Sequence, residues 1–175
     1  MTRNHNDRDS VIQITTRGRY AVGAVLHIAL HSEIGPVPLS EISVCQNIST
    51  SYVDQIFAAL RPAGIIEGIP GPGGGYRLAR PASHISVAEI LAAVERGKDS
   101  SIYRSPLEGA VWSSLMAGIE GLMERITMAD LVERPAVREW LLREYQGGPW
   151  RCETCGVYTD RRAAVSSYVP KRRAM

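Results

Sequence analysis

Apolar residues recur at helical spacing through the first third of the chain. A helix over about residues 16–30 is predicted by apolar positions at i, i+4, i+5 and i+8, namely Tyr20, Ala24, Val25 and Ile28. Prolines in the segment 35–38 should end it, because proline lacks an N–H donor and restricts the residue before it. Two short helices are expected next, over 39–46 and from about 50 to 61, with a left-handed turn at Asn47 between them.

Two short stretches of alternating apolar residues, 65–69 and 76–79, flank a loop rich in glycine and proline. This pattern predicts a β-hairpin. The sequence Ser86-Val87-Ala88-Glu89 has the spacing of a capping box and should open another helix.

A longer amphipathic helix is expected over about 107–125. Its stripe advances in steps of three or four residues: Leu107, Val111, Leu115, Ile119, Leu122 and Ile126. Such a stripe could line a cofactor pocket, but an amphipathic helix beside a small domain needs a partner, which favours a dimer interface. One or two short helices with a break near Pro135 should follow, and little regular structure is expected after residue 149.

These elements predict a mainly α fold: a winged helix-turn-helix with a small β-hairpin wing and a long C-terminal dimerisation helix. The expected organisation is a disordered tail over 1–11, a winged-helix DNA-binding domain over 12–96, a linker over 97–106, dimerisation helices over 107–145 and a flexible tail over 146–175.

The second helix of the pair carries residues suited to the major groove of DNA. Hydroxyl, amide and carboxylate groups can read base edges by hydrogen bonding, and the expected outward positions are Thr50, Ser51, Tyr52, Asp54, Gln55 and Arg61. Phosphate contacts are expected from Arg17, Arg19, Arg61 and Arg77, and from the wing amides at Gly73, Gly74 and Gly75. The glycines could instead form only a surface turn. They are not a P-loop, because no Gly-Lys-Ser/Thr follows.

Four ordered motifs carry a family resemblance. They are Thr16-Arg17-Gly18-Arg19-Tyr20-Ala21, Gly35-Pro36-Val37-Pro38-Leu39, Ile48-Ser49-Thr50-Ser51-Tyr52-Val53-Asp54-Gln55-Ile56-Phe57 and Gly71-Pro72-Gly73-Gly74-Gly75-Tyr76. With them the chain resembles the IscR-type winged-helix regulators, closely over about 12–96 and more loosely to about 132. The resemblance implies a dimeric bacterial transcription regulator whose long helices cross to form the dimer. It also implies groove reading by Ser51, Tyr52, Asp54 and Gln55.

The chain departs from this family pattern in two places. Many members have an arginine before the wing glycines, used in the minor groove, where this chain has Pro70. Well-known members hold an iron–sulfur cluster with three cysteines and one further ligand ahead of the long helix. Here the stretch from Glu95 to Trp112 contains neither Cys nor His. Because these clusters need thiolate or imidazole donors, no cluster is expected at the usual family site.

Composition narrows the class without deciding the function. The chain has 175 residues, 45% of them hydrophobic and 22% charged, which is typical of a globular protein. The formal net charge is +2, but residues 151–175 alone carry six Lys and Arg against two Asp and Glu. No apolar run approaches the roughly 18–20 residues of a membrane span, and the polar first ten residues do not resemble a secretory signal. We therefore expect a cytoplasmic, nucleoid-associated protein with no membrane partner.

The remaining candidates are thiols and imidazoles. Cys152 and Cys155 have the spacing of half a zinc or iron–sulfur site, which a dimer could complete; a redox disulfide and two incidental thiols are the alternatives. The alternative function is accordingly a metal- or redox-responsive thiol protein, a sensor or carrier without DNA binding. His27 and His31 are four apart on the first helix, a spacing that can bind metal, but no Glu follows His27 as in a hydrolase motif. Cys45 is expected to be a small buried side chain.

The sequence contains no Ser/His/Asp, paired-carboxylate or Cys/His pattern at a spacing typical of a catalytic site, so no enzyme is expected. The sequence predicts a homodimeric, sequence-specific DNA-binding regulator that reads an inverted-repeat operator through a recognition helix and a glycine-rich wing.

Overall fold

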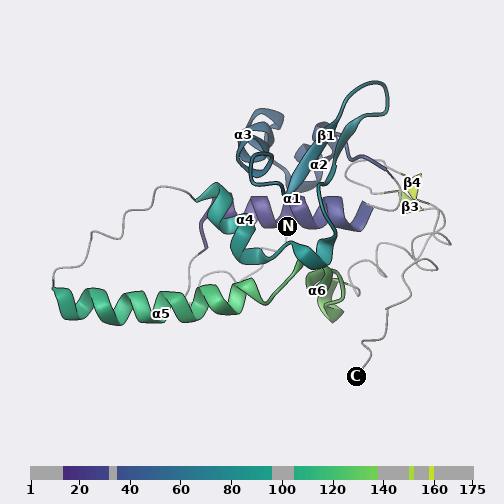
Figure 1. The fold of residues 1–175 in the computed structure, drawn as a ribbon. Coiled ribbons are helices and arrows are strands. Elements are labelled where there is room, and N and C mark those ends of the chain that lie inside the picture. Colours follow the sequence, from purple (N-terminus) through teal and green to yellow (C-terminus); the bar gives the residue numbers. More distant parts are fainter. Residues whose placement is uncertain (1–13, 32–34, 96–104, 138–149, 152–157, 160–175) are drawn as a thin grey trace, which may run out of the picture.

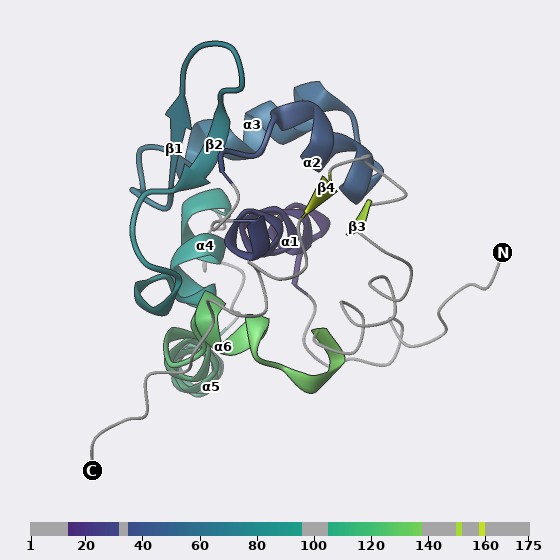
Figure 2. The same ribbon diagram turned by 90° about the vertical axis from the view of Figure 1, so that its right-hand side faces the viewer.

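The computed structural model describes residues 14–31, 35–95, 105–137, 150–151 and 158–159 (Figure 1). Helix α1 runs through the middle of the body, and the other elements of the N-terminal half pack around it (Figure 2). The elements in chain order are α1 (Thr16–His31), α2 (Leu39–Gln46), α3 (Thr50–Leu60), β1 (Ile66–Ile69), β2 (Gly75–Leu78), η2 (Ala82–His84), α4 (Val87–Val94), α5 (Pro106–Glu124), α6 (Met128–Val132), β3 (Trp150–Arg151) and β4 (Tyr158–Thr159).

The core lies between α1 and the elements that surround it. Small residues on the inner face of α1, Ala21 and Ala24, let its neighbours approach closely, and Ile28 fills the space one turn further on. Large apolar side chains from the other elements complete the core: Ile42, Val53, Ile56, Phe57, Leu60, Ile65, Ile66, Ile85, Ile90 and Met128. Burial of these side chains supplies the main stabilisation of the domain.

Helices α2 and α3 form the predicted helix-turn-helix. The turn passes through Asn47, whose φ of 52° is the expected left-handed conformation. Ile42 and Val53 are fully buried, and Ile48 is partly buried and packs against the core. The Ser49 side chain then accepts a hydrogen bond from the Tyr52 N–H at 3.2 Å and caps α3.

Strands β1 and β2 form an antiparallel hairpin in the register Ile66↔Leu78 to Ile69↔Gly75. A bridge between Val37 and Tyr76 ties this hairpin to the segment before α2. The Tyr76 ring also packs edge-on against Phe57 of α3, with ring centroids 4.6 Å apart. The hairpin is thus attached to α3 and to the segment that leads into α2.

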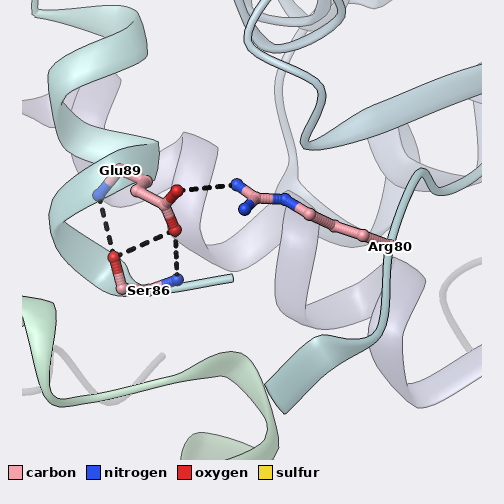
Figure 3. Close-up of polar contacts among 3 residues, drawn as sticks. All are labelled: Arg80, Ser86 and Glu89. Atoms are coloured by element: carbon pink, nitrogen blue, oxygen red, sulfur yellow. Dashed lines mark hydrogen bonds and ion pairs between the residues drawn. The ribbon is translucent and has the colours of Figure 1, made fainter. Parts of the chain in front are cut away.

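Helix α4 begins with the predicted capping box (Figure 3). The Glu89 N–H donates to the Ser86 hydroxyl at 3.2 Å, and the Ser86 N–H donates to the Glu89 carboxylate at 2.9 Å. Arg80 approaches the same carboxylate at 2.8 Å. The hydrogen bond from the Ser86 backbone, followed by the one from Arg80, holds the pKa of Glu89 below its usual value.

Helix α5 extends from the body, and none of its residues is buried (Figure 1). Five residues of the predicted stripe lie on it. Four of them are at least half exposed: Leu107, Val111, Leu115 and Leu122. Ile119 is half-buried. Ile126 differs, because it follows the end of the helix and packs against the core of its own chain.

The fold class is confirmed: the chain is mainly helical with a two-stranded wing. In the segment after residue 149, where little regular structure was expected, β3 and β4 pair as strands of two residues each. The tail 1–11, most of the linker 97–106 and most of 138–175 lie outside the described residues, so the domain limits there stay predictions. Among the described helices, none is both long and apolar enough to cross a membrane.

Candidate nucleic-acid interface

Helix α3 has one buried face and one outward polar face. Val53, Ile56, Phe57 and Leu60 are buried, because apolar residues recur every three or four positions. The exposed positions on the opposite side are Ser51, Asp54, Gln55 and Ala58, together with Thr50 at the start of the helix. The side chains of Ser51, Asp54 and Gln55 are therefore open to a ligand along the first two turns of the helix.

Two other predicted base-reading residues are held by neighbouring elements. The Thr50 hydroxyl donates to the Ser43 hydroxyl at 3.3 Å, and Ser43 in turn donates to the Ile48 carbonyl at 2.6 Å. Tyr52 is half-buried, with its ring edge-on to Tyr20 of α1 at 6.0 Å. These contacts fix the orientation of α3 on α2 and α1 at the end that would meet DNA.

Predicted phosphate-binding arginines border the outer face of α3. Arg17 reaches across from α1 and donates from Nη2 to the Gln55 backbone carbonyl at 3.3 Å. Arg61 is exposed directly after α3, and Arg19 is exposed on α1. The structure thus places two arginines at α3: Arg61, which caps its C-terminal end, and Arg17, which comes from α1.

The wing glycines have a backbone role that the sequence left open. Gly71 and Gly73 have φ of 99° and 76°, which side chains rarely adopt, and the Gly74 N–H donates to the Gly71 carbonyl at 2.9 Å. A Cβ at Gly74 would lie 2.2 Å from the Ile69 carbonyl oxygen, and one at Gly75 would lie 2.5 Å from that of Val37. Glycine is therefore needed for the turn and for docking of the wing; its phosphate contacts stay a prediction.

Arg77 on the wing carries an unpredicted partner. Glu67 stands directly opposite in the β1–β2 register, and its carboxylate lies 2.5 Å from the Arg77 Nε. Both side chains are about half exposed. Once the hairpin register is known, the pairing follows from cross-strand geometry. It means that a phosphate near the wing would share Arg77 with Glu67.

Helix α3 and the wing loop project from the same side of the body, whereas α5 lies on the opposite side (Figures 1 and 2). A capped helix with an outward polar face, arginines beside it and a hairpin wing on the same side define a winged-helix DNA-binding protein.

Comparison with known proteins agrees with this class. Residues 14–134 match the family Rrf2, described as "Iron-dependent Transcriptional regulator". The chain belongs to this family and is an IscR-like, DNA-binding transcriptional regulator. It is 41% identical to the HTH-type transcriptional regulator IscR of Photobacterium profundum over 137 residues, 73% of this chain and 80% of the relative. It is 38% identical to IscR of Klebsiella pneumoniae over 144 residues, 77% of this chain and 88% of the relative.

Solved structures show the same fold. The chain superposes on T. potens IscR with a TM-score of 0.61 at 32% identity, covering 70% of this chain and 88% of that one. The global cysteine regulator CymR of B. subtilis gives a TM-score of 0.59 at 26% identity, with 69% and 95% covered. The predicted resemblance to IscR-type regulators is confirmed.

The family description names iron, and the donor chemistry at the usual family position does not fit an iron–sulfur cluster. Between Glu95 and Trp112 the chain offers no thiolate and no imidazole. Cys152 and Cys155 lie outside the described residues and outside the matched range, so their zinc, cluster or redox role stays a prediction. Because the relatives are transcriptional regulators, the family supports DNA binding over a thiol carrier that lacks it. Cys45 is half-buried on α2.

The histidine pair of α1 acquires a third residue that the sequence did not indicate. His27 Nε2 lies 3.1 Å from the Glu41 carboxylate of α2, and His31 Nε2 lies 3.8 Å from the same oxygen. The two rings stack with centroids 4.3 Å apart. Burial, followed by the neighbouring His27, lowers the pKa of His31. Glu41 was missed because only the packing of α1 on α2 brings it to the histidines.

Proposed function

We propose that the chain is a homodimeric regulator that binds an inverted-repeat operator, with α3 in the major groove and the wing along the flanking backbone. The observation that carries this proposal is the outer face of α3, where Ser51, Asp54 and Gln55 are exposed on a helix fixed from behind. A helix of this kind fits the major groove, where its N-terminal half reaches base edges. The protein would act on chromosomal DNA in the cytoplasm.

Base readout is assigned by side-chain chemistry. Gln55 can pair in bidentate fashion with adenine, Asp54 can accept from a cytosine amino group, and Ser51 can contact either a base or a phosphate. Arg17, Arg19, Arg61 and Arg77 would neutralise phosphates. The contact of Arg17 with the Gln55 carbonyl supports this assignment, because it would hold Arg17 beside Gln55 at the edge of the major groove.

The dimer is supported by α5. Its apolar face has no cover within the described chain, and Leu107, Val111, Trp112, Leu115, Met116 and Leu122 are between 41% and 75% exposed. A contiguous apolar face of this kind marks a protein interface. A second copy of α5 would cover it by the same residues, because a two-fold interface is self-complementary. Two copies of α3 would then face two half-sites.

The direct test measures specific and random DNA separately. Binding to the protein's own upstream region is measured by gel shift and footprinting, alongside a random duplex of equal length. Gln55→Ala should reduce the binding free-energy difference between specific and random DNA by about 1–3 kcal/mol, because one bidentate base contact is lost. Gln46→Ala is the matched control, since the Gln46 side chain lies against Gly23 of α1 rather than on the outer face of α3. Equal weakening on both duplexes would refute the assignment of Gln55.

The dimer has its own test. Leu115→Asp introduces a charge into the exposed apolar face of α5, and it should convert the dimer to a monomer because burial of an unpaired charge is costly. Sedimentation measures the mass, and gel shift should show operator binding weakened with it. Ser113→Asp, on the other side of the helix, should leave both unchanged. A monomeric wild-type protein that still binds its operator would contradict the proposal.

A further inference from the structure

His27, His31 and Glu41 form a compact group between α1 and α2. None of the three lies on α3, which carries the proposed base-reading residues. One ligand atom from each residue, a ring nitrogen of either imidazole or a carboxylate oxygen, lies within 4.8 Å of the other two. The side chains are between 6% and 11% exposed, so the group is nearly closed to solvent. Two imidazoles and a carboxylate converge there from two different helices.

We infer that His27, His31 and Glu41 bind one divalent first-row transition-metal ion, which fastens α1 to α2. The inference goes beyond DNA binding and does not depend on it. Two histidines and one carboxylate are the donor set of many zinc sites, and also of ferrous sites with open positions. Hard cations such as Mg²⁺ and Ca²⁺ prefer oxygen donors and are not expected here.

The distances suit such an ion. With metal–ligand bonds of about 2.0–2.2 Å and tetrahedral angles, neighbouring ligand atoms stand roughly 3.3–3.6 Å apart. The two histidine-to-Glu41 separations, 3.1 Å and 3.8 Å, lie on either side of that value. The i, i+4 spacing of the histidines puts both rings on one face of α1, directly over Glu41.

The hydrogen bond on the far side of His31 orients its ring for this role. Its Nδ1 lies 2.8 Å from the His27 backbone carbonyl, which can only accept, so Nδ1 carries the proton. In the neutral ring, Nε2 then presents a lone pair towards the Glu41 carboxylate. Two electron-rich atoms that face each other favour a cation between them. Histidine ligands of metals typically donate their other N–H to a backbone carbonyl in this way.

Binding of the metal ion would affect the helix-turn-helix through the packing of α2 on α1. Glu41 lies on α2, which supports α3 through the contacts of Ser43, whereas both histidines lie on α1. An ion shared by the two helices would lower the free energy of the folded arrangement, because a ligand that binds only the native state stabilises it. Because metal ligands must be deprotonated, the affinity for the ion would fall at acidic pH.

The test uses the full chain with Cys152→Ser and Cys155→Ser, so that these thiols do not compete for the metal. The protein is stripped with a chelator and titrated with Zn²⁺ by calorimetry, and parallel titrations use anaerobic Fe²⁺ and Mg²⁺. The expected result is one Zn²⁺ per chain and a raised thermal midpoint, with Fe²⁺ competing and Mg²⁺ inert. His31→Asn and Glu41→Gln should each weaken Zn²⁺ binding by more than the 10–100-fold typical of losing an outer-shell partner.

The control is His84→Asn, an exposed histidine on η2 that should leave Zn²⁺ binding unchanged. Glu41→Gln keeps a hydrogen-bond acceptor for His27, and circular dichroism of each metal-free variant checks that it is folded. X-ray absorption of the loaded protein should report imidazole and oxygen donors. Absence of stoichiometric Zn²⁺ binding would overturn the inference and leave a plain buried ion pair. So would a Zn²⁺ affinity in the His31 and Glu41 variants equal to that of the wild type. Gel shifts in chelator test DNA binding separately.

Discussion

The ion pair across the wing gives a quantitative test of DNA contact. If Arg77 neutralises a phosphate, each wing contributes about 0.9 to the slope of log affinity against log salt, or roughly 1.8 for two wings. Arg77→Ala should flatten the slope by that amount on specific and random duplex alike. Between 50 and 200 mM salt, the advantage of the wild type over the variant should therefore shrink roughly tenfold.

Glu67 sharpens the same prediction. The pair is 57% exposed at Arg77 and 44% at Glu67, so it contributes less than about 1 kcal/mol to folding. Glu67→Gln removes the competing charge and should strengthen binding to any duplex, by up to about fivefold per wing, with little change in the thermal midpoint. Salt-dependent fluorescence anisotropy measures both effects.

A matched control distinguishes the loss of a phosphate contact at the wing from the loss of a positive charge elsewhere on the protein. Arg125→Ala removes an exposed arginine directly after α5, on the side opposite the wing, and should leave the slope unchanged. An unaltered slope in Arg77→Ala would refute the phosphate contact. So would a weaker complex in Glu67→Gln, because the carboxylate would then be supporting the wing rather than screening it.

Two further predictions concern stability. Gly75→Ala would put a Cβ 2.5 Å from the Val37 carbonyl oxygen, and we expect a loss of about 1–3 kcal/mol in denaturant unfolding. Gly68→Ala, whose nearest contact is 3.7 Å, serves as its control, and equal losses would contradict the reasoning. The lowered pKa of Glu89 makes its stabilisation full above the unfolded value near 4.5 and lost as pH falls through the lower folded value. The stability gap between wild type and Glu89→Gln should therefore narrow below pH 4.5, and a constant gap would count against it.

Local features were predictable because neighbouring residues decide them. The i, i+4 stripe of α1, the left-handed Asn47 and the capping box at Ser86 all depend on chemistry within one or two turns of chain. The outward face of α3 followed from the same periodicity, because once its apolar residues are buried the remaining positions must face solvent. Ile126 shows the limit, since a continued period of four could not reveal that the helix ends at Glu124.

The sequence by itself determined the order of the elements, the polar character of α3 and the lack of cluster ligands before α5. Only the tertiary structure decided which distant side chains meet. Glu67 faces Arg77 because the hairpin has one register, Arg17 reaches Gln55 because α1 crosses behind α3, and Glu41 joins the histidines because α1 packs on α2. Short-range spacing fixes a helix or a turn, whereas a contact between elements depends on the packing of the whole core.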